Sequence, residues 1–235
     1  MGNPYFRFKQ FAVYHDTCAM KVNTDGCLLG GWANHTEPKN ILDIGAGSGV
    51  IGLMLAQRFE HAQITLVEID AQCATQCALN AAKSPFAERV STVNSAIQDF
   101  KPNTQFDLIV SNPPYFENDT PAVGEARLSA RHHHTLTLKE LFHAAACLLT
   151  TNGQFCLILP YHRLAKTLEI ASQVGLQISQ QINIRSLPNK PVTRVLLAFS
   201  TQPSALKIKE MNIEVLPGEY SAESKQLLGD FYLNL

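Results

Sequence analysis

Short apolar runs alternate with helical patterns along most of the chain, beginning near residue 40. The apolar runs predict buried strands at residues 40–44, 64–67, 106–111 and 154–159. Apolar residues at helical spacing predict helices at residues 50–59, 70–82, 138–149 and 164–174. This alternation is typical of βαβ units, so the predicted fold class is α/β, with a mostly parallel sheet and helices on both faces.

The end of the sheet is predicted to have a different connection. Residues 176–185 and 192–200 are strand-like, and only residues 186–191, a turn-rich segment with two prolines, lie between them. Because this connection is too short for a crossover helix, the two strands must be antiparallel. One strand therefore breaks the parallel order.

The same patterns divide the chain into three parts. Residues 1–38 form an N-terminal arm that covers the site, residues 39–201 form the core, and residues 202–235 form an appendage packed on that core. The arm lacks helical periodicity, and its residues 6–13 alternate like a short strand. The appendage is expected to end in a helix capped by Ser221.

Composition narrows the class of protein. With 46% hydrophobic and 17% charged residues, the 235-residue chain is neither disordered nor collagen-like. No signal peptide or membrane span is predicted. The six cysteines have neither zinc nor disulfide spacing, so we expect reduced core residues in a cytosolic protein. A net charge of −1 argues against a large nucleic-acid surface, although residues 161–235 carry eight Lys and Arg against six Asp and Glu.

A glycine-rich loop follows the first predicted strand. Gly47, Gly49 and Gly52 have the G-x-G-x-x-G spacing of a dinucleotide site, which keeps a nicotinamide-dependent oxidoreductase among the alternatives. Asp43, however, precedes the loop at the strand end. Its carboxylate would repel a pyrophosphate and suits a cationic or amino-bearing ligand.

Residues 42–49 resemble the cofactor loop of the class I methyltransferases, which bind S-adenosylmethionine, a sulfonium with an amino group and no phosphate. The resemblance implies a Rossmann-like fold with a seven-stranded sheet. It places the methionine part of the cofactor beside Asp43, Gly45, Ala46, Gly47 and Gly49.

Two further cofactor contacts are expected at the ends of the next strands. Glu68 has the position and chemistry to accept hydrogen bonds from both ribose hydroxyls, whereas Asp70 is predicted to cap the following helix. By the resemblance, Ser95 and Ala96 lie beside the adenine ring, at a place where many members carry an acid.

A buried strand is followed directly by Asn112-Pro113-Pro114-Tyr115-Phe116. This sequence resembles the Asn-Pro-Pro-Tyr motif of methyltransferases that act on planar NH2 groups. Such nitrogens are poor nucleophiles because their lone pair is delocalised. The Asn112 side-chain oxygen and the Pro113 carbonyl can each accept one N–H hydrogen bond and stabilise the positive charge that develops.

The remaining residues of this motif are expected to hold the acceptor and the cofactor. Tyr115 offers a ring on which the flat acceptor can stack, with Pro114 and Phe116 beside it. Asn112 must also lie next to the methyl donor. No strong general base is needed, so His132, His133 and His134 are assigned to a solvated loop or substrate flap rather than to catalysis or a metal site.

Three acceptors use this chemistry: the glutamine side chain of a protein such as a release factor, guanine N2 in rRNA, and adenine N6. The first two classes of enzyme carry a substantial preceding domain, and only about 40 residues precede the glycine loop here. The arm, the motif and the tail instead resemble the bacterial tRNA1(Val) adenine-N6 methyltransferase family over the whole chain. That resemblance implies a cytoplasmic enzyme, expected to be monomeric, that methylates the adenine 3′ of the anticodon. It also implies that Thr24 and Asp25 close over the methionine end of the cofactor.

Overall fold

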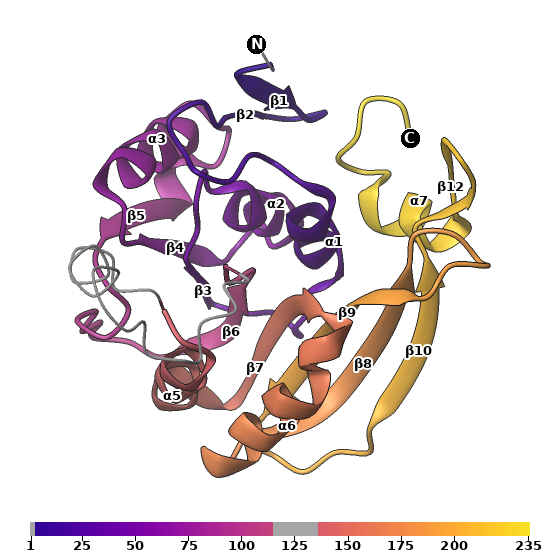
Figure 1. Ribbon diagram of the computed structural model, residues 1–235. Helices are drawn as coiled ribbons and strands as arrows, with labels where there is room; N and C mark the ends of the chain where they lie inside the picture. Colours follow the sequence, from indigo (N-terminus) through magenta and orange to yellow (C-terminus); the bar gives the residue numbers. More distant parts are fainter. Residues whose placement is uncertain (1–2, 115–135) are drawn as a thin grey trace, which may run out of the picture.

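The computed structural model describes residues 3–114 and 136–235 (Figure 1). Its centre is an eight-stranded sheet. The strands are β3 (Asn40–Ile44), β4 (Gln63–Glu68), β5 (Val90–Asn94), β6 (Phe106–Ser111), β7 (Leu149–Pro160), β8 (Gln177–Arg185), β9 (Val192–Ser200) and β10 (Lys207–Asn212).

The order of the sheet is β10-β8-β9-β7-β6-β3-β4-β5. Strand β9 runs antiparallel to both β7 and β8, and every other pair is parallel. The predicted α/β class and the single antiparallel strand are confirmed. The expectation of seven strands is wrong by one, because β10 extends the sheet by pairing with β8. This strand comes from the predicted appendage. The division into arm, core and appendage therefore stays a prediction.

Helices cover both faces of the sheet (Figure 1). They are α1 (Thr24–Trp32), α2 (Val50–Arg58), α3 (Ala71–Ala82), α5 (Leu138–Leu148), α6 (Leu164–Gln173) and α7 (Ala222–Leu228), with short 3-10 turns at Ala87–Arg89 and Tyr161–Arg163. Successive residues of β3 point to opposite faces. Ile41 joins the hydrophobic cluster that includes Leu53 of α2, and Leu42 joins the cluster that includes Phe142 of α5.

Helix α1 lies in the arm, where no helical periodicity is present in the sequence. Its residues 26–31 are all buried, so no apolar stripe distinguishes one side of the helix from the other. Two glycines permit this burial. A Cβ on Gly30 would lie 2.9 Å from Met54 Sδ on α2, and one on Gly31 would lie 2.5 Å from the Leu227 carbonyl on α7. The lack of periodicity thus reflects a helix packed on all sides.

The two ends of the chain pack together. Strands β1 (Tyr5–Arg7) and β2 (Ala12–Tyr14) form a small hairpin where a single short strand was expected. The Lys9 amide donates to the Phe231 carbonyl over 2.7 Å. A second small sheet joins β11 (Glu214–Leu216) to β12 (Glu219–Tyr220) ahead of α7. Ser221 caps α7 as predicted, since its hydroxyl accepts from the Ser224 amide over 3.0 Å.

The expectation that all six cysteines are reduced is wrong. Cys18 in the arm and Cys73 in α3 form a disulfide across 55 residues. Spacing rules miss such a bond because it joins segments that only the fold brings together. Cys27, Cys77 and Cys156 are buried free thiols, and Cys147 is exposed. Within residues 3–114 and 136–235, no helix has both the length and the apolar character that a bilayer crossing requires.

Candidate active site

The glycine loop and the Asn112 motif meet at the carboxyl edge of the sheet. Strands β3 and β6 are parallel neighbours, with Asp43 opposite Val110. The Ser111 hydroxyl donates to the Ile44 carbonyl over 2.9 Å, which ties the last residues of the two strands together. Asn112 is half-buried and Pro113 is buried directly after this link. The structure thus brings together the two segments that the sequence predicted to form one site.

Part of the predicted acceptor site lies outside the described residues. Tyr115 and Phe116 fall there, as do His132, His133 and His134. Pro114, the last described residue before that segment, is half-buried. Among the residues that the structure does describe, no cluster of three or more His, Cys, Asp or Glu side chains could hold a metal ion.

The glycines of the loop have two different roles. Gly45, Gly47 and Gly49 have φ angles of 70°, 57° and 85°, which disfavour other residues. A Cβ on Gly45 or Gly47 would meet no atom of the described residues within 4 Å, whereas one on Gly49 would lie 2.9 Å from Cys77 Sγ. A Cβ on Gly52 would lie 2.1 Å from Leu66 Cδ2 on β4. The first two glycines therefore border open space that a ligand can fill, and the last two allow close packing.

This division predicts separable effects of substitution. Gly47→Ala should weaken cofactor binding, because the new methyl group projects into the open space, and should cost only about 1–2 kcal/mol of stability through its positive φ. Gly52→Ala should lower the free energy of unfolding by roughly 1–3 kcal/mol through overpacking against Leu66. Calorimetric titration with S-adenosylmethionine and urea unfolding of both variants would check this. Equal losses of affinity in the two would contradict the division.

Asp43 is a fully buried carboxylate at the base of the loop. Its Oδ2 accepts from the Gly52 amide over 3.1 Å, and its Oδ1 has no hydrogen-bond partner among the described residues. Burial, reinforced by the charge of nearby Glu68, raises the pKa of Asp43 to about 7. A cationic group beside the loop would give the ionised carboxylate the partner that it lacks.

The raised pKa predicts a dependence of stability on pH. The folded state takes up a proton as the pH falls below about 7, whereas the ordinary pKa of the group is 3.8. The contribution of Asp43 to the free energy of unfolding is therefore greatest below about pH 4 and falls as the pH rises to about 7. Asp43→Asn should remove this part of the profile in the ligand-free protein. Urea unfolding of both proteins between pH 4 and 8 measures it, and parallel profiles would contradict it.

Glu68, at the end of β4, is hydrogen-bonded to the glycine loop. It is nearly buried, and its Oε2 accepts from the Gly47 amide over 2.8 Å. Its Oε1 accepts from the Asp70 amide over 2.9 Å. Each carboxylate oxygen has a second acceptor position, which leaves capacity for the two ribose hydroxyls. Asp70 itself caps α3 as predicted, accepting from the Cys73 amide over 2.7 Å.

The turn after β5 lies beside Glu68. The Ser95 amide donates to the Glu68 carbonyl over 3.1 Å, and the Ser95 hydroxyl donates to the Ala96 carbonyl over 2.9 Å. Asn94, one residue before the predicted adenine contact, donates from its side chain to the carbonyls of Glu68 and Ile69, over 2.9 Å each.

Thr24 and Asp25 form the first turn of α1, which Asn23 caps by accepting from the Gly26 amide over 2.9 Å. This turn packs against the start of α2, since a Cβ on Gly26 would lie 3.6 Å from Val50 Cγ1. Asp25 therefore lies near the end of the glycine loop. Its Oδ2 forms an ion pair with Arg194 Nε of β9 over 2.7 Å. Sequence reasoning had no signal for this pair.

Two polar residues of α3 hold the arm near the loop. Asn80 is buried and donates to the carbonyls of Tyr14 and Ser48, over 2.8 and 2.9 Å, so it links the arm to the glycine loop. Gln76 accepts from the Thr17 amide over 3.1 Å. Both residues lie on the helix face that carries Cys73. Polar residues at this spacing within an alanine-rich helix are the sequence signal for these contacts.

Comparisons with known proteins show the family of this chain. The model of the methyltransferase small domain matches residues 26–176. A tRNA1(Val) (adenine(37)-N6)-methyltransferase from Phocaeicola vulgatus is 45% identical over 235 residues, covering 100% of both chains. A protein of the same name from Photorhabdus laumondii is 44% identical, over 97% of this chain and 95% of the relative.

The chain belongs to the tRNA1(Val) (adenine(37)-N6)-methyltransferase family. Solved structures support the fold. A predicted O-methyltransferase from Agrobacterium tumefaciens has a TM-score of 0.68 at 18% identity, covering 88% of this chain and 97% of its own. A ribosomal protein L11 methylase from Lactobacillus delbrueckii has a TM-score of 0.53 at 19% identity, covering 76% and 78%. The cofactor of this methyltransferase family is S-adenosylmethionine. The alternative of a nicotinamide-dependent oxidoreductase is therefore excluded.

Proposed function

We propose that this protein transfers a methyl group from S-adenosylmethionine to N6 of the adenine 3′ of the anticodon, position 37, in tRNA1(Val). The observation that carries the proposal is the link between Ser111 and Ile44, which sets Asn112 and Pro113 beside the glycine loop. Relatives that are 40–45% identical over 97–100% of this chain bear the name of that activity. The same proposal places the protein in the cytoplasm, acting as a monomer.

The residues of the loop fit the cofactor. Asp43 Oδ1, which no described residue pairs with, suits the cationic amino group of the methionine part. Gly45 and Gly47, whose side-chain positions meet no described atom within 4 Å, admit a ligand close to the backbone. Glu68 retains acceptor capacity for the ribose, with Ser95 and Ala96 at the adenine end. When bound, S-adenosylmethionine supplies an electrophilic methyl group on a sulfonium.

The protein's own part in the reaction is to position and polarise the acceptor. The Asn112 side-chain oxygen and the Pro113 carbonyl accept the two N–H bonds of the adenine amine and stabilise the charge that develops on it. Buried Pro113 keeps the backbone of this segment rigid. Tyr115 is assigned to stack on the base, with Pro114 and Phe116 beside it, which holds the amine in line with the methyl group.

An anticodon-loop adenine is already unpaired, so drawing it into the site costs less than extrusion from a duplex. Stacking on Tyr115 contributes roughly 1–3 kcal/mol for each base. We therefore expect Tyr115→Ala to raise KM for tRNA by about 5- to 150-fold while cofactor affinity is retained. Initial-rate kinetics with tRNA would check this, and an unchanged KM would contradict the assignment of Tyr115.

The proposal is tested by methylating total tRNA from a strain that lacks the gene, followed by mapping of the modified nucleoside. N6-methyladenosine at position 37 of tRNA1(Val) is the expected result. The two alternatives left by the motif are separated by offering labelled cofactor with rRNA or with a release-factor protein. Label in guanine N2 or in a glutamine side chain, with none in tRNA, would overturn the proposal.

A further inference from the structure

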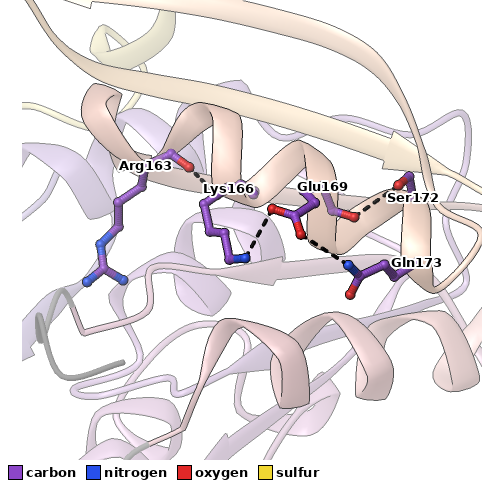
Figure 2. Close-up of polar contacts among 6 residues, drawn as sticks. Arg163, Lys166, Glu169, Ser172 and Gln173 are labelled. Atoms are coloured by element: carbon purple, nitrogen blue, oxygen red, sulfur yellow. Dashed lines mark hydrogen bonds and ion pairs between the residues drawn. The ribbon is translucent and has the colours of Figure 1, made fainter. Parts of the chain in front are cut away.

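The ion pair between Asp25 and Arg194 joins residues 169 positions apart in the sequence. The Asp25 side chain is 18% exposed and that of Arg194 is 34% exposed. The pair between Lys166 and Glu169 on α6 gives a contrast, with side chains 48% and 55% exposed. Figure 2 shows that second pair, with Gln173 on the same carboxylate. Exposed ion pairs such as Lys166–Glu169 contribute little to stability. The Asp25–Arg194 pair is more buried and joins distant segments, so it is suited to hold those segments in place.

Each end of the pair lies on a different part of the site. Asp25 is in the first turn of α1, which packs on the start of α2 directly after the glycine loop. Arg194 lies near the start of β9, opposite Pro160 at the end of β7. Because β9 is antiparallel, its start lies at the same edge as the ends of β7 and β6. The pair therefore spans the edge from the cofactor loop to the side that carries Asn112.

The geometry restrains the Asp25 carboxylate. Arg194 Nε donates to Asp25 over 2.7 Å, and Arg194 NH1 donates to the Thr193 carbonyl over 3.1 Å. The planar guanidinium is thus held by its own backbone while it faces the acid, and a flexible ammonium would not reproduce this. An acid in the first turn is also favoured by the helix dipole, so α1 presents an oriented Asp25 side chain.

We propose that Arg194 is a positioning residue, which orients Asp25 and fixes the start of α1 over the methionine end of the cofactor. The proposal rests on the assignment of Asp25 to the cofactor. Arg194 acts through Asp25 and need not touch the tRNA. Loss of Arg194 should therefore weaken cofactor binding and leave KM for tRNA unchanged.

A double-mutant cycle on the full-length enzyme tests this. Arg194→Ala and Asp25→Asn should each weaken binding of S-adenosylhomocysteine by roughly 3- to 10-fold, and the double variant should be no weaker than the worse single one. Arg194→Lys should restore only part of the loss. KM for S-adenosylmethionine should rise with the same ranking, while kcat and KM for tRNA stay unchanged.

Arg185→Ala is the matched control, because it breaks an ion pair with Glu210 of β10, and Arg185 lies opposite Val192 at the start of β9. Cofactor affinity should be unchanged in this variant. Additive losses in the double variant, or a higher KM for tRNA with normal cofactor affinity in Arg194→Ala, would overturn the proposal. Cofactor titration needs no tRNA, so it tests the role of Arg194 even if the proposed acceptor proves wrong.

Discussion

Replacing Asn112 with alanine should lower kcat by about 100- to 1,000-fold, the loss seen when one oriented polar group is removed from a charge-stabilising site. The side-chain oxygen is one of the two acceptors assigned to the adenine amine. Without it, only the Pro113 carbonyl remains to stabilise the positive charge that develops on nitrogen. Cofactor affinity should change little, because Asp43, Gly47 and Glu68 form the binding loop independently of Asn112. Single-turnover methylation of tRNA, with calorimetric titration of the cofactor, measures both effects.

A second substitution distinguishes lost chemistry from lost structure. Asn112→Asp keeps a side-chain oxygen as acceptor and should retain far more activity than Asn112→Ala. Asn103→Ala makes the same substitution at an exposed position before β6. It is the matched control and should leave activity unchanged. Full activity in Asn112→Ala would show that the amine is activated by other groups, and the proposed mechanism would then fail.

Local signals in the sequence were sufficient for much of this site. Strand β6 has the predicted bounds because its apolar run ends at a polar residue, and Asp70 caps α3 because its side chain reaches an amide three residues ahead. The glycine loop and Asn112 could be placed together because parallel strands end at one edge. Each of these inferences needs only neighbouring residues and a general rule of sheet topology.

The features that the sequence did not reveal depend on contacts between distant segments. Helix α1 has no periodic pattern because neighbours surround it, and its glycines gain meaning only against α2 and α7. Strand β10 lacks an apolar run because it is an edge strand, with charged Lys207 and Lys209. The partnership of Arg194 with Asp25 appears only once β9 is placed beside β7.

The disulfide between Cys18 and Cys73 should be the largest single contribution to stability in the arm. Closing a loop of 55 residues restricts the unfolded chain, and chain entropy alone predicts a loss of about 4 kcal/mol when the bond is removed. Cys73→Ser should therefore lower the free energy of unfolding strongly. Cys147→Ser, which changes an exposed free thiol, should be nearly neutral. Urea unfolding without reductant compares the two.

Thiol titration of the unfolded protein tests this bond directly. Protein purified and unfolded without reductant should show four reactive thiols out of the six cysteines, and reduction should expose all six. With the bond absent, Gln76 and Asn80 would still hold residues 14–17 against α3, so cofactor affinity should fall less than stability. Six thiols before reduction, or equal unfolding curves for the two variants, would contradict a stabilising disulfide.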